Sequence, residues 1–345
     1  MRVTTAVESA EGPNWRPDPL PGFEQRSIAL AGSLIPGESE LRATLVRRTL
    51  AADPGRDARP RAVLSFPGMN DAFYHPHVAD FFERQGFTFY ALDPRRSGRS
   101  LTDPRFRDFV TDLSEVYEEL DAAHDEIASR HESVVVWAHS TGGLAASLWA
   151  SDRPGRLAGL ALNSPWLGLW GTSVYAPVIH GAMTVLSRRD PLQLIPLPDP
   201  GDRYAICAGV DPFAALGFDP GLTTPGAIPI RAGWLRAVLR GQRRLAKGLN
   251  IDAPVFVACS SRSYVRAAGF SQRARTSDVV LDVEQIATRA PKLGKRVFLL
   301  RVPDGFHDLT LSVPEARDLL FAELGRWLSA YAHAPSRAAS ASVSV

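Results

Sequence analysis

Ser140 stands in the middle of the run VVVWAHSTGGLAASLWA (134–150), between a stretch of β-branched and aromatic residues and a stretch of helix formers. The pattern predicts a strand that ends in a tight turn and a helix that begins directly after it. Ala138 and Gly142 flank the serine at two positions on either side, and their small size lets backbone segments approach it. A serine presented in this way can act as a nucleophile if a base and oxyanion donors are near. A serine that only caps the following helix would give the same local pattern.

A nucleophilic serine needs a general base, and the chain contains eight histidines. Only His307 follows a predicted late strand, residues 296–302, through the turn Pro303-Asp304-Gly305. The other seven lie beside the serine, after a possible oxyanion loop, on an acidic helix, in a long insertion or in the tail: His139, His75, His77, His124, His131, His180 and His333. We therefore predict that His307 is the base.

A carboxylate is needed to orient this histidine, and the segment after the strand at 253–258 contains candidates. Residues 259–277 contain no Asp or Glu, so Asp278 is the first carboxylate reached. Asp278 could instead cap a helix that begins near Val279. In that case the acid would be Asp282, Asp304 or Asp308.

The elements that must position these residues can be read from apolar runs. Strands are predicted at 43–50, 61–66, 87–92, 133–138, 157–162, 253–258 and 296–302. Continuous apolar strands that alternate with helices predict an α/β fold with a mostly parallel central sheet and helices on both faces. In residues 112–127, apolar side chains recur at helical spacing and acidic ones take the opposite face, which indicates a solvated helix rather than a metal site.

The segment 166–250 breaks this rhythm, since it is rich in Pro, Gly and aromatic residues and separates two strands by far more than a usual connection. Ligands in such sheets bind at the carboxyl ends of the strands, so we predict that this insertion is a cap over the site. The predicted organisation is a loose leader at 1–24, a core at 25–165 and 251–332, the cap, and a disordered tail at 333–345.

Three blocks in chain order resemble a known superfamily. They are FPGMNDAFYHPHVADFFERQGFTFYALDPRRSGRS (66–100), WAHSTGGLAASLWA (137–150) and PDGFHDLTLS (303–312). Together they resemble the oxyanion strand and loop, the nucleophile elbow and the histidine loop of α/β-hydrolases, specifically of the monoacylglycerol lipase and lysophospholipase-like branch. The resemblance covers about residues 61 to 330. Pro67 and Ala138 depart from the pattern, where the family usually has His and Gly.

The resemblance implies a serine hydrolase with an α/β-hydrolase fold and an inserted cap. On its pattern Ser140 is the nucleophile, Asp278 the acid with Asp282 as its neighbour, and His307 the base. The backbone N–H groups of Met69 and Thr141 would form the oxyanion hole. This chemistry uses the protein's own groups, so we predict neither a cofactor nor a metal. The DPRRSGRS turn (93–100) is expected to organise loops.

The composition sets limits on partners. The chain has 345 residues, of which 45% are hydrophobic and 22% charged, with a formal net charge of +2. The charges are interspersed, so no nucleic acid or anionic membrane partner is indicated. The N-terminus lacks the apolar core of a signal peptide, and two cysteines without metal spacing fit a reducing compartment, so we expect a cytoplasmic protein. Residues 157–187 are nearly free of charge but interrupted by Pro and Gly, and no transmembrane segment is expected.

The substrate is less constrained than the reaction. Aromatic residues of the insertion, Trp166, Trp170 and Tyr175, could line an apolar acyl pocket. We expect a medium or long acyl ester, with a lysophospholipid or monoacylglycerol as the resemblance suggests. An acyltransferase or thioesterase-like biosynthetic enzyme would use the same triad, and a non-catalytic binding protein would keep only the fold. The sequence leaves the oligomeric state open.

Overall fold

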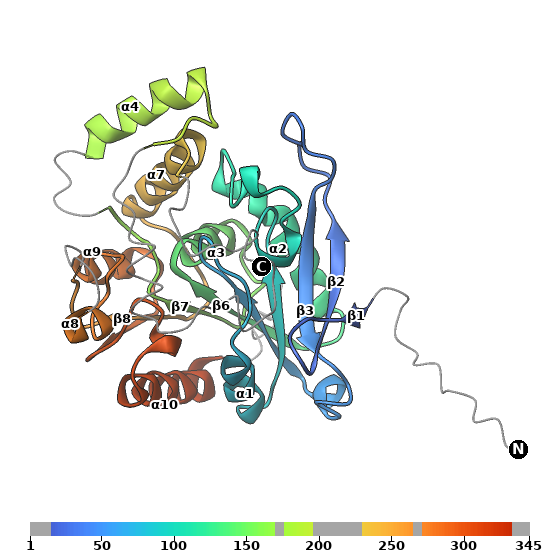
Figure 1. Cartoon of the computed structure of the whole chain (residues 1–345). Helices are drawn as coiled ribbons and strands as arrows, with labels where there is room; N and C mark the ends of the chain where they lie inside the picture. The colour runs from blue at the N-terminus through green and yellow to red at the C-terminus, as the bar shows by residue number, and fades with distance from the viewer. Residues whose placement is uncertain (1–14, 170–175, 196–229, 265–270, 333–345) are drawn as a thin grey trace, which may run out of the picture.

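Figure 1 shows the computed structural model of the chain, which describes residues 15–169, 176–195, 230–264 and 271–332. Within these residues the strands form one nine-stranded sheet in the order β1-β2-β3-β5-β4-β6-β7-β8-β9. The strands are β1 (Arg16–Pro17), β2 (Phe23–Ala29), β3 (Arg42–Arg48), β4 (Arg61–Phe66), β5 (Phe87–Asp93), β6 (Ser133–His139), β7 (Gly159–Asn163), β8 (Val255–Ser260) and β9 (Val297–Val302). The pairs β1–β2, β2–β3 and β3–β5 are antiparallel. The six strands β5, β4, β6, β7, β8 and β9 run parallel to one another.

Helices cover both faces of this sheet (Figure 1). They are α1 (Pro76–Arg84), α2 (Tyr117–Ala128), α3 (Ser140–Asp152), α4 (Ala176–Arg189), α7 (Ala232–Ala246), α8 (Gln272–Arg275), α9 (Val283–Arg289) and α10 (Pro314–Tyr331). One apolar cluster joins α1 and α10 to the sheet, and the rings of Phe81 and Phe321 stack with centroids 4.5 Å apart. A second cluster joins α2, α3 and α7 to the opposite face. The inner strands β4 to β8 are largely buried on both sides, which explains their continuous apolar runs.

All seven predicted strands are present, with ends that differ by up to a few residues. The hairpin β1–β2 was not predicted, because β2 alternates buried and exposed positions and carries charged side chains instead of a continuous apolar run.

The predicted leader, residues 1–24, extends too far toward the C-terminus, because β1 and the start of β2 lie within it. Residues 16 and 17 pair with β2, and the buried carboxylate of Asp18 accepts a hydrogen bond from Arg99 Nε at 2.6 Å. The guanidinium of Arg47 lies 3.9 Å from the ring centroid of Trp15. These contacts join segments far apart in the chain, so local composition could not reveal them. Residues 1–14, like the predicted tail at 333–345, lie outside the described residues.

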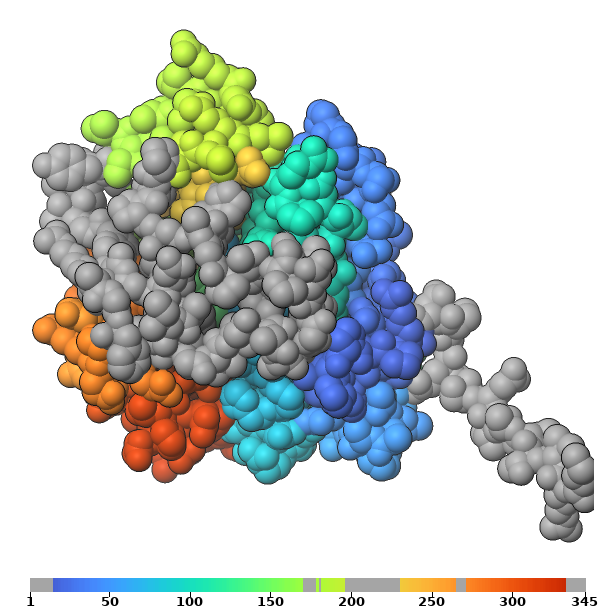
Figure 2. Space-filling view, in the orientation of Figure 1, coloured from blue at the N-terminus to red at the C-terminus, as the bar shows by residue number. Residues whose placement is uncertain are grey.

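The predicted cap contains α4 and α7, which lie between β7 and β8 in the chain. Helix α7 buries Trp234 and Val238 in the apolar cluster that it shares with α2, α3 and one face of the sheet. Helix α4 lies beyond α7 at one end of the molecule (Figures 1 and 2). Residues 196–229 lie outside the described residues, so the cap over the site stays a prediction. Among the described helices, none combines the length and apolar character needed to cross a bilayer.

Candidate active site

Ser140 lies at a sharp turn between β6 and α3, at the carboxyl edge of the sheet. Its φ of +50° is in the left-handed region, which a residue with a side chain enters only under local strain. The residue before the helix is His139, and no side chain caps this helix end. The Ser140 hydroxyl therefore does not serve as a helix cap. It lies 3.1 Å from His307 Nε2 instead.

The elbow depends on a glycine. A Cβ placed on Gly142 would lie 1.9 Å from the carbonyl oxygen of Pro67. The loop after β4 can therefore pack directly against the start of α3 only because this residue has no side chain. The same close approach holds at Gly68, where a Cβ would lie 3.0 Å from the Cβ of Ser140.

His307 follows β9 through a turn in which Asp304 has a φ of +53°. Its side chain is buried, and Nδ1 lies 2.9 Å from Asp278 Oδ2. Because a carboxylate only accepts hydrogen bonds, Nδ1 donates to Asp278 and Nε2 is left to accept from the Ser140 hydroxyl. The structure thus brings Ser140, His307 and Asp278 into one hydrogen-bonded chain.

Asp278 is held by the backbone around it. It is fully buried, and its Oδ1 accepts hydrogen bonds from the N–H groups of Val280 at 2.8 Å and Leu281 at 2.7 Å. Its other oxygen faces His307. Asp278 therefore makes the local turn and the contact with the imidazole at the same time.

The alternative carboxylates have other partners. Asp282 caps α9 by accepting from Glu284 N at 3.1 Å. Asp304 accepts from Arg262 Nη2 at 2.7 Å on the surface. Asp308 accepts from Asn163 Nδ2 at 2.7 Å. The geometry favours Asp278 as the acid.

Met69 lies in a loop whose neighbouring amides are bound to carboxylates. Gly68 N–H points to Asp71 Oδ2 at 3.4 Å, and Asn70 N–H donates to Asp108 Oδ2 at 2.8 Å. Burial raises the pKa of Asp71 to about 7 and that of Asp108 to about 6. Holding these amides fixes the direction of the peptide between them, in a loop that approaches the start of α3 where Gly68 lies against Ser140.

The DPRRSGRS turn supports this loop, as expected from the sequence. Asp93 Oδ1 accepts from Phe73 N at 3.2 Å, and Ser97 Oγ donates to Asp71 O at 3.0 Å. The arginines of the turn make buried ion pairs with Glu119, Glu38, Asp93 and Asp18. The turn organises the loop that carries Met69.

Of the predicted pocket residues, Trp166 is described, and Trp170 and Tyr175 lie outside the described residues. Trp166 is half-buried, its backbone N–H donates to Ser140 O at 2.9 Å, and its ring centroid lies 6.0 Å from that of Trp234. Its indole Nε1 is buried and, among the described residues, makes no hydrogen bond. Trp166 thus lies directly beside Ser140.

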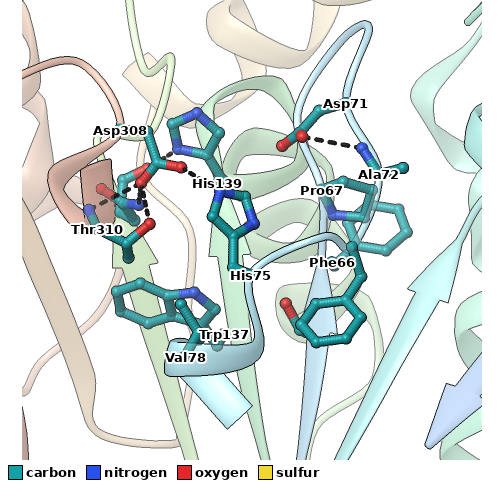
Figure 3. A pocket seen from close by; sticks show the side chains of 13 residues that line it. Phe66, Pro67, Asp71, Ala72, His75, Val78, Trp137, His139, Asp308 and Thr310 are labelled. Carbon is teal, nitrogen blue, oxygen red and sulfur yellow. Dashed lines mark hydrogen bonds and ion pairs between the residues drawn. The ribbon is translucent and has the colours of Figure 1, made fainter. Parts of the chain in front are cut away.

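The sequence reasoning missed a group of polar residues next to the triad. Figure 3 shows His75, His139, Asp308 and Thr310 around a cavity of about 30 Å³, whose wall also includes Asn163. Burial lowers the pKa of His139 to about 4, so this imidazole is neutral at physiological pH. The one available signal was that His139 and Asp308 each adjoin a triad residue in the sequence. No group of side chains suited to a metal ion occurs in the described part of the chain.

Comparisons with known proteins indicate a family. The family model described as serine aminopeptidase, S33, matches residues 58–279. Among curated proteins, a monoacylglycerol lipase of Mycolicibacterium smegmatis is 29% identical over 207 residues, which cover 59% of this chain and 70% of that protein.

Solved structures show the fold. A monoacylglycerol lipase of Paleococcus ferrophilus gives a TM-score of 0.56 at 18% identity, covering 78% of this chain and 94% of the other. A soluble variant of the monoglyceride lipase of Saccharomyces cerevisiae, in complex with a substrate analogue, gives 0.58 at 15% identity, covering 85% and 93%. A lipase in an open form gives 0.61 at 18% identity, covering 90% and 99%. The α/β-hydrolase fold predicted from the sequence is confirmed.

Proposed function

The chain belongs to the serine aminopeptidase S33 family and is a serine hydrolase of the α/β-hydrolase fold, and on this premise we propose that it cleaves carboxylic esters through an acyl-serine intermediate. The observation that carries the proposal is the chain of hydrogen bonds from Ser140 Oγ to His307 Nε2 at 3.1 Å and from His307 Nδ1 to Asp278 Oδ2 at 2.9 Å. The order of these residues along the chain is that of α/β-hydrolases.

In the proposed mechanism His307 takes the proton of the Ser140 hydroxyl while the serine oxygen attacks the ester carbonyl. The carbonyl oxygen becomes an oxyanion, which the backbone N–H groups of Met69 and Thr141 stabilise. His307 then gives its proton to the departing alcohol. Asp278 holds the imidazole in the required tautomer and stabilises its positive charge.

The second half of the reaction uses the same groups. His307 removes a proton from a water molecule, which attacks the acyl carbonyl, and the Ser140 oxygen leaves and recovers its proton from the imidazolium. The acid is released and the enzyme returns to its starting state. The chemistry requires no group from outside the chain besides water and substrate.

We propose a medium or long acyl ester of a small alcohol as the substrate, with a monoacylglycerol or a lysophospholipid as the leading candidates. The similarity to the Mycolicibacterium smegmatis monoacylglycerol lipase and the aromatic Trp166 beside the serine support an apolar acyl group. In this proposal the segment 166–250 is a cap, and Trp166, Trp170 and Tyr175 line the acyl pocket. A cytoplasmic location accords with the free buried thiol of Cys259.

The nucleophile is tested by comparing the wild type with Ser140→Ala on a p-nitrophenyl acyl ester. We expect turnover to fall by at least about 10⁴-fold, as it does when a triad nucleophile is removed, while the melting temperature changes little. A fluorophosphonate probe should label the wild type and not the variant. Turnover by Ser140→Ala at the wild-type rate would show that the nucleophile is another residue.

The substrate class is tested with a panel of monoacylglycerols, lysophospholipids and short acyl esters, with aminoacyl amides included because of the family's description. The proposal expects the highest kcat/KM on a medium or long acyl ester. Transfer of the acyl group to an added alcohol or amine, in preference to water, would indicate an acyltransferase instead.

A further inference from the structure

Asn163 lies at the carboxyl end of β7 and touches both segments that carry the proposed nucleophile and base. Its backbone oxygen accepts from His139 Nδ1 at 3.0 Å, and His139 directly precedes Ser140. Its side chain reaches the other segment, where Nδ2 donates to Asp308 Oδ1 at 2.7 Å and Oδ1 accepts from Leu309 N at 3.2 Å. Asp308 and Leu309 directly follow His307. One buried asparagine therefore ties the two catalytic segments together.

Asp308 is the anchor of this connection on the histidine side. Besides Asn163, its Oδ1 accepts from Thr310 N at 2.9 Å and from Thr310 Oγ1 at 2.7 Å. Its Oδ2 faces His75 Nε2 at 3.2 Å. Burial would raise the pKa of Asp308, but His139, His75 and the Thr310 hydroxyl outweigh burial and hold it well below its usual range. Asp308 is thus a buried carboxylate whose Oδ1 accepts three hydrogen bonds, which restrain its position.

The two carboxylates near His307 have different tasks. Asp278 contacts the imidazole ring itself. Asp308 instead holds the backbone that directly follows His307, through Asn163 and Thr310. The rings of His139 and His307 lie with centroids 4.9 Å apart, so a shift of either segment would change the distance from Ser140 Oγ to His307 Nε2.

We propose that Asn163 and Asp308 form a clamp that sets the distance between the nucleophile and the general base. The proposal rests on the proposed function, in which Ser140 and His307 are those two groups. Both clamp residues are positioning residues, since they act through the segments on either side and not on the substrate. Loss of the clamp should lower kcat and leave KM nearly unchanged, because the substrate still binds.

The first test is Asn163→Asp, which places a second carboxylate against Asp308 with little change of shape. Two carboxylates at this distance cannot both be ionised without strong repulsion, and a shared proton restores the hydrogen bond. At pH 8 we expect kcat to fall about tenfold or more, the usual effect of losing a hydrogen bond to a buried charge. As the pH is lowered, the ratio of the variant's kcat to that of the wild type should rise.

The groups that face this pair could also titrate, so the wild type is measured over the same pH range. They are Asp71 and His75 from the loop before α1, His139 from β6, and His307 from the loop after β9. All four are present in both proteins, so they cancel in the ratio of variant to wild type. Gln85→Glu makes the same amide-to-carboxylate change outside the proposed cap, between α1 and β5 at the opposite edge of the sheet, and should leave kcat unchanged.

A second test removes a different contact of the clamp. Thr310→Val removes one donor to Asp308 with little change of shape, and should also lower kcat without raising KM. It provides the test if Asn163→Asp does not fold.

The outcomes separate the clamp from the proposed function. A wild type that neither turns over esters nor reacts with a fluorophosphonate would overturn the proposed function. An active wild type whose folded Asn163→Asp variant keeps the wild-type kcat at pH 8 would overturn the clamp. So would a loss of kcat in Asn163→Asp that is the same at every pH, because that result is expected from general damage to the site.

Discussion

Replacing Asp278 with Asn tests whether Asp278 is the acid, because the exchange changes which nitrogen of His307 carries the proton. Oδ1 of Asp278 accepts two backbone N–H groups, from Val280 and Leu281, at 2.8 and 2.7 Å. An amide at this position must keep its oxygen toward those donors, since its NH₂ group would leave them unpaired. The NH₂ group of the introduced amide then faces His307 Nδ1. Nδ1 must accept a hydrogen bond, so the proton of the neutral imidazole moves to Nε2.

The size of the effect follows from this change of tautomer. With a proton on Nε2, His307 cannot accept the proton of Ser140, and the positive imidazolium that forms in the reaction loses its carboxylate. The same exchange in a serine protease triad, a worked case among known enzymes, lowers kcat by about 10⁴-fold. A 10⁴-fold loss corresponds to about 5 kcal/mol in the activation free energy. We expect a loss of this size here, because the two backbone donors prevent the amide from rotating.

The assay is kcat for a p-nitrophenyl acyl ester at pH 8, with thermal unfolding to show that the variant is folded. Asp282→Asn is the matched control, four residues away. Asp282 accepts from Glu284 N and caps α9, and Asn caps a helix about as well as Asp, so kcat should stay within about twofold. A larger loss from Asp282→Asn than from Asp278→Asn would refute the assignment of the acid.

Two further predictions concern the loop beside the serine. Gly142→Ala puts a Cβ 1.9 Å from Pro67 O, so the elbow and the loop must separate; we expect a loss of about 1–3 kcal/mol in unfolding free energy and a large drop in turnover. Gly181→Ala in α4, where a Cβ meets no atom of the described residues within 4 Å, should instead add up to about 1 kcal/mol to the unfolding free energy, and thermal unfolding compares the two. Asp71 has a folded pKa of about 7 against about 3.9 when unfolded, so between these values the folded state binds more protons and stability falls as pH rises. Asp71→Asn removes this dependence, so urea unfolding at several pH values should show the wild type losing stability relative to the variant from about pH 4 to 7; an unchanged difference would contradict the raised pKa.

The parts of the fold that could be predicted are those that produce a recognisable pattern in a short stretch of the sequence. Strands β4, β6 and β8 lie inside the sheet and are buried on both faces, so each one required an unbroken apolar run from which it could be located. The hairpin β1–β2 at the sheet edge has no such requirement and was missed. The ion pair of Asp18 with Arg99 joins residues 81 positions apart, which no local pattern records.

The candidate site divides in the same way. Ser140 and His307 could be proposed as nucleophile and base from the chain alone, because a strand, a turn and small neighbours must surround a presented serine, and a histidine after the last strand must return to the same sheet edge. The choice between Asp278 and Asp282 needed the tertiary structure. Both residues stand in one short segment, and by sequence either could be the N-cap of the following helix. Only the folded path of the loop turns Asp278 inward to His307 and leaves Asp282 at the start of α9. The role proposed for Asn163 also required the tertiary structure, since it depends on contacts with residues 24 and about 145 positions away in the chain.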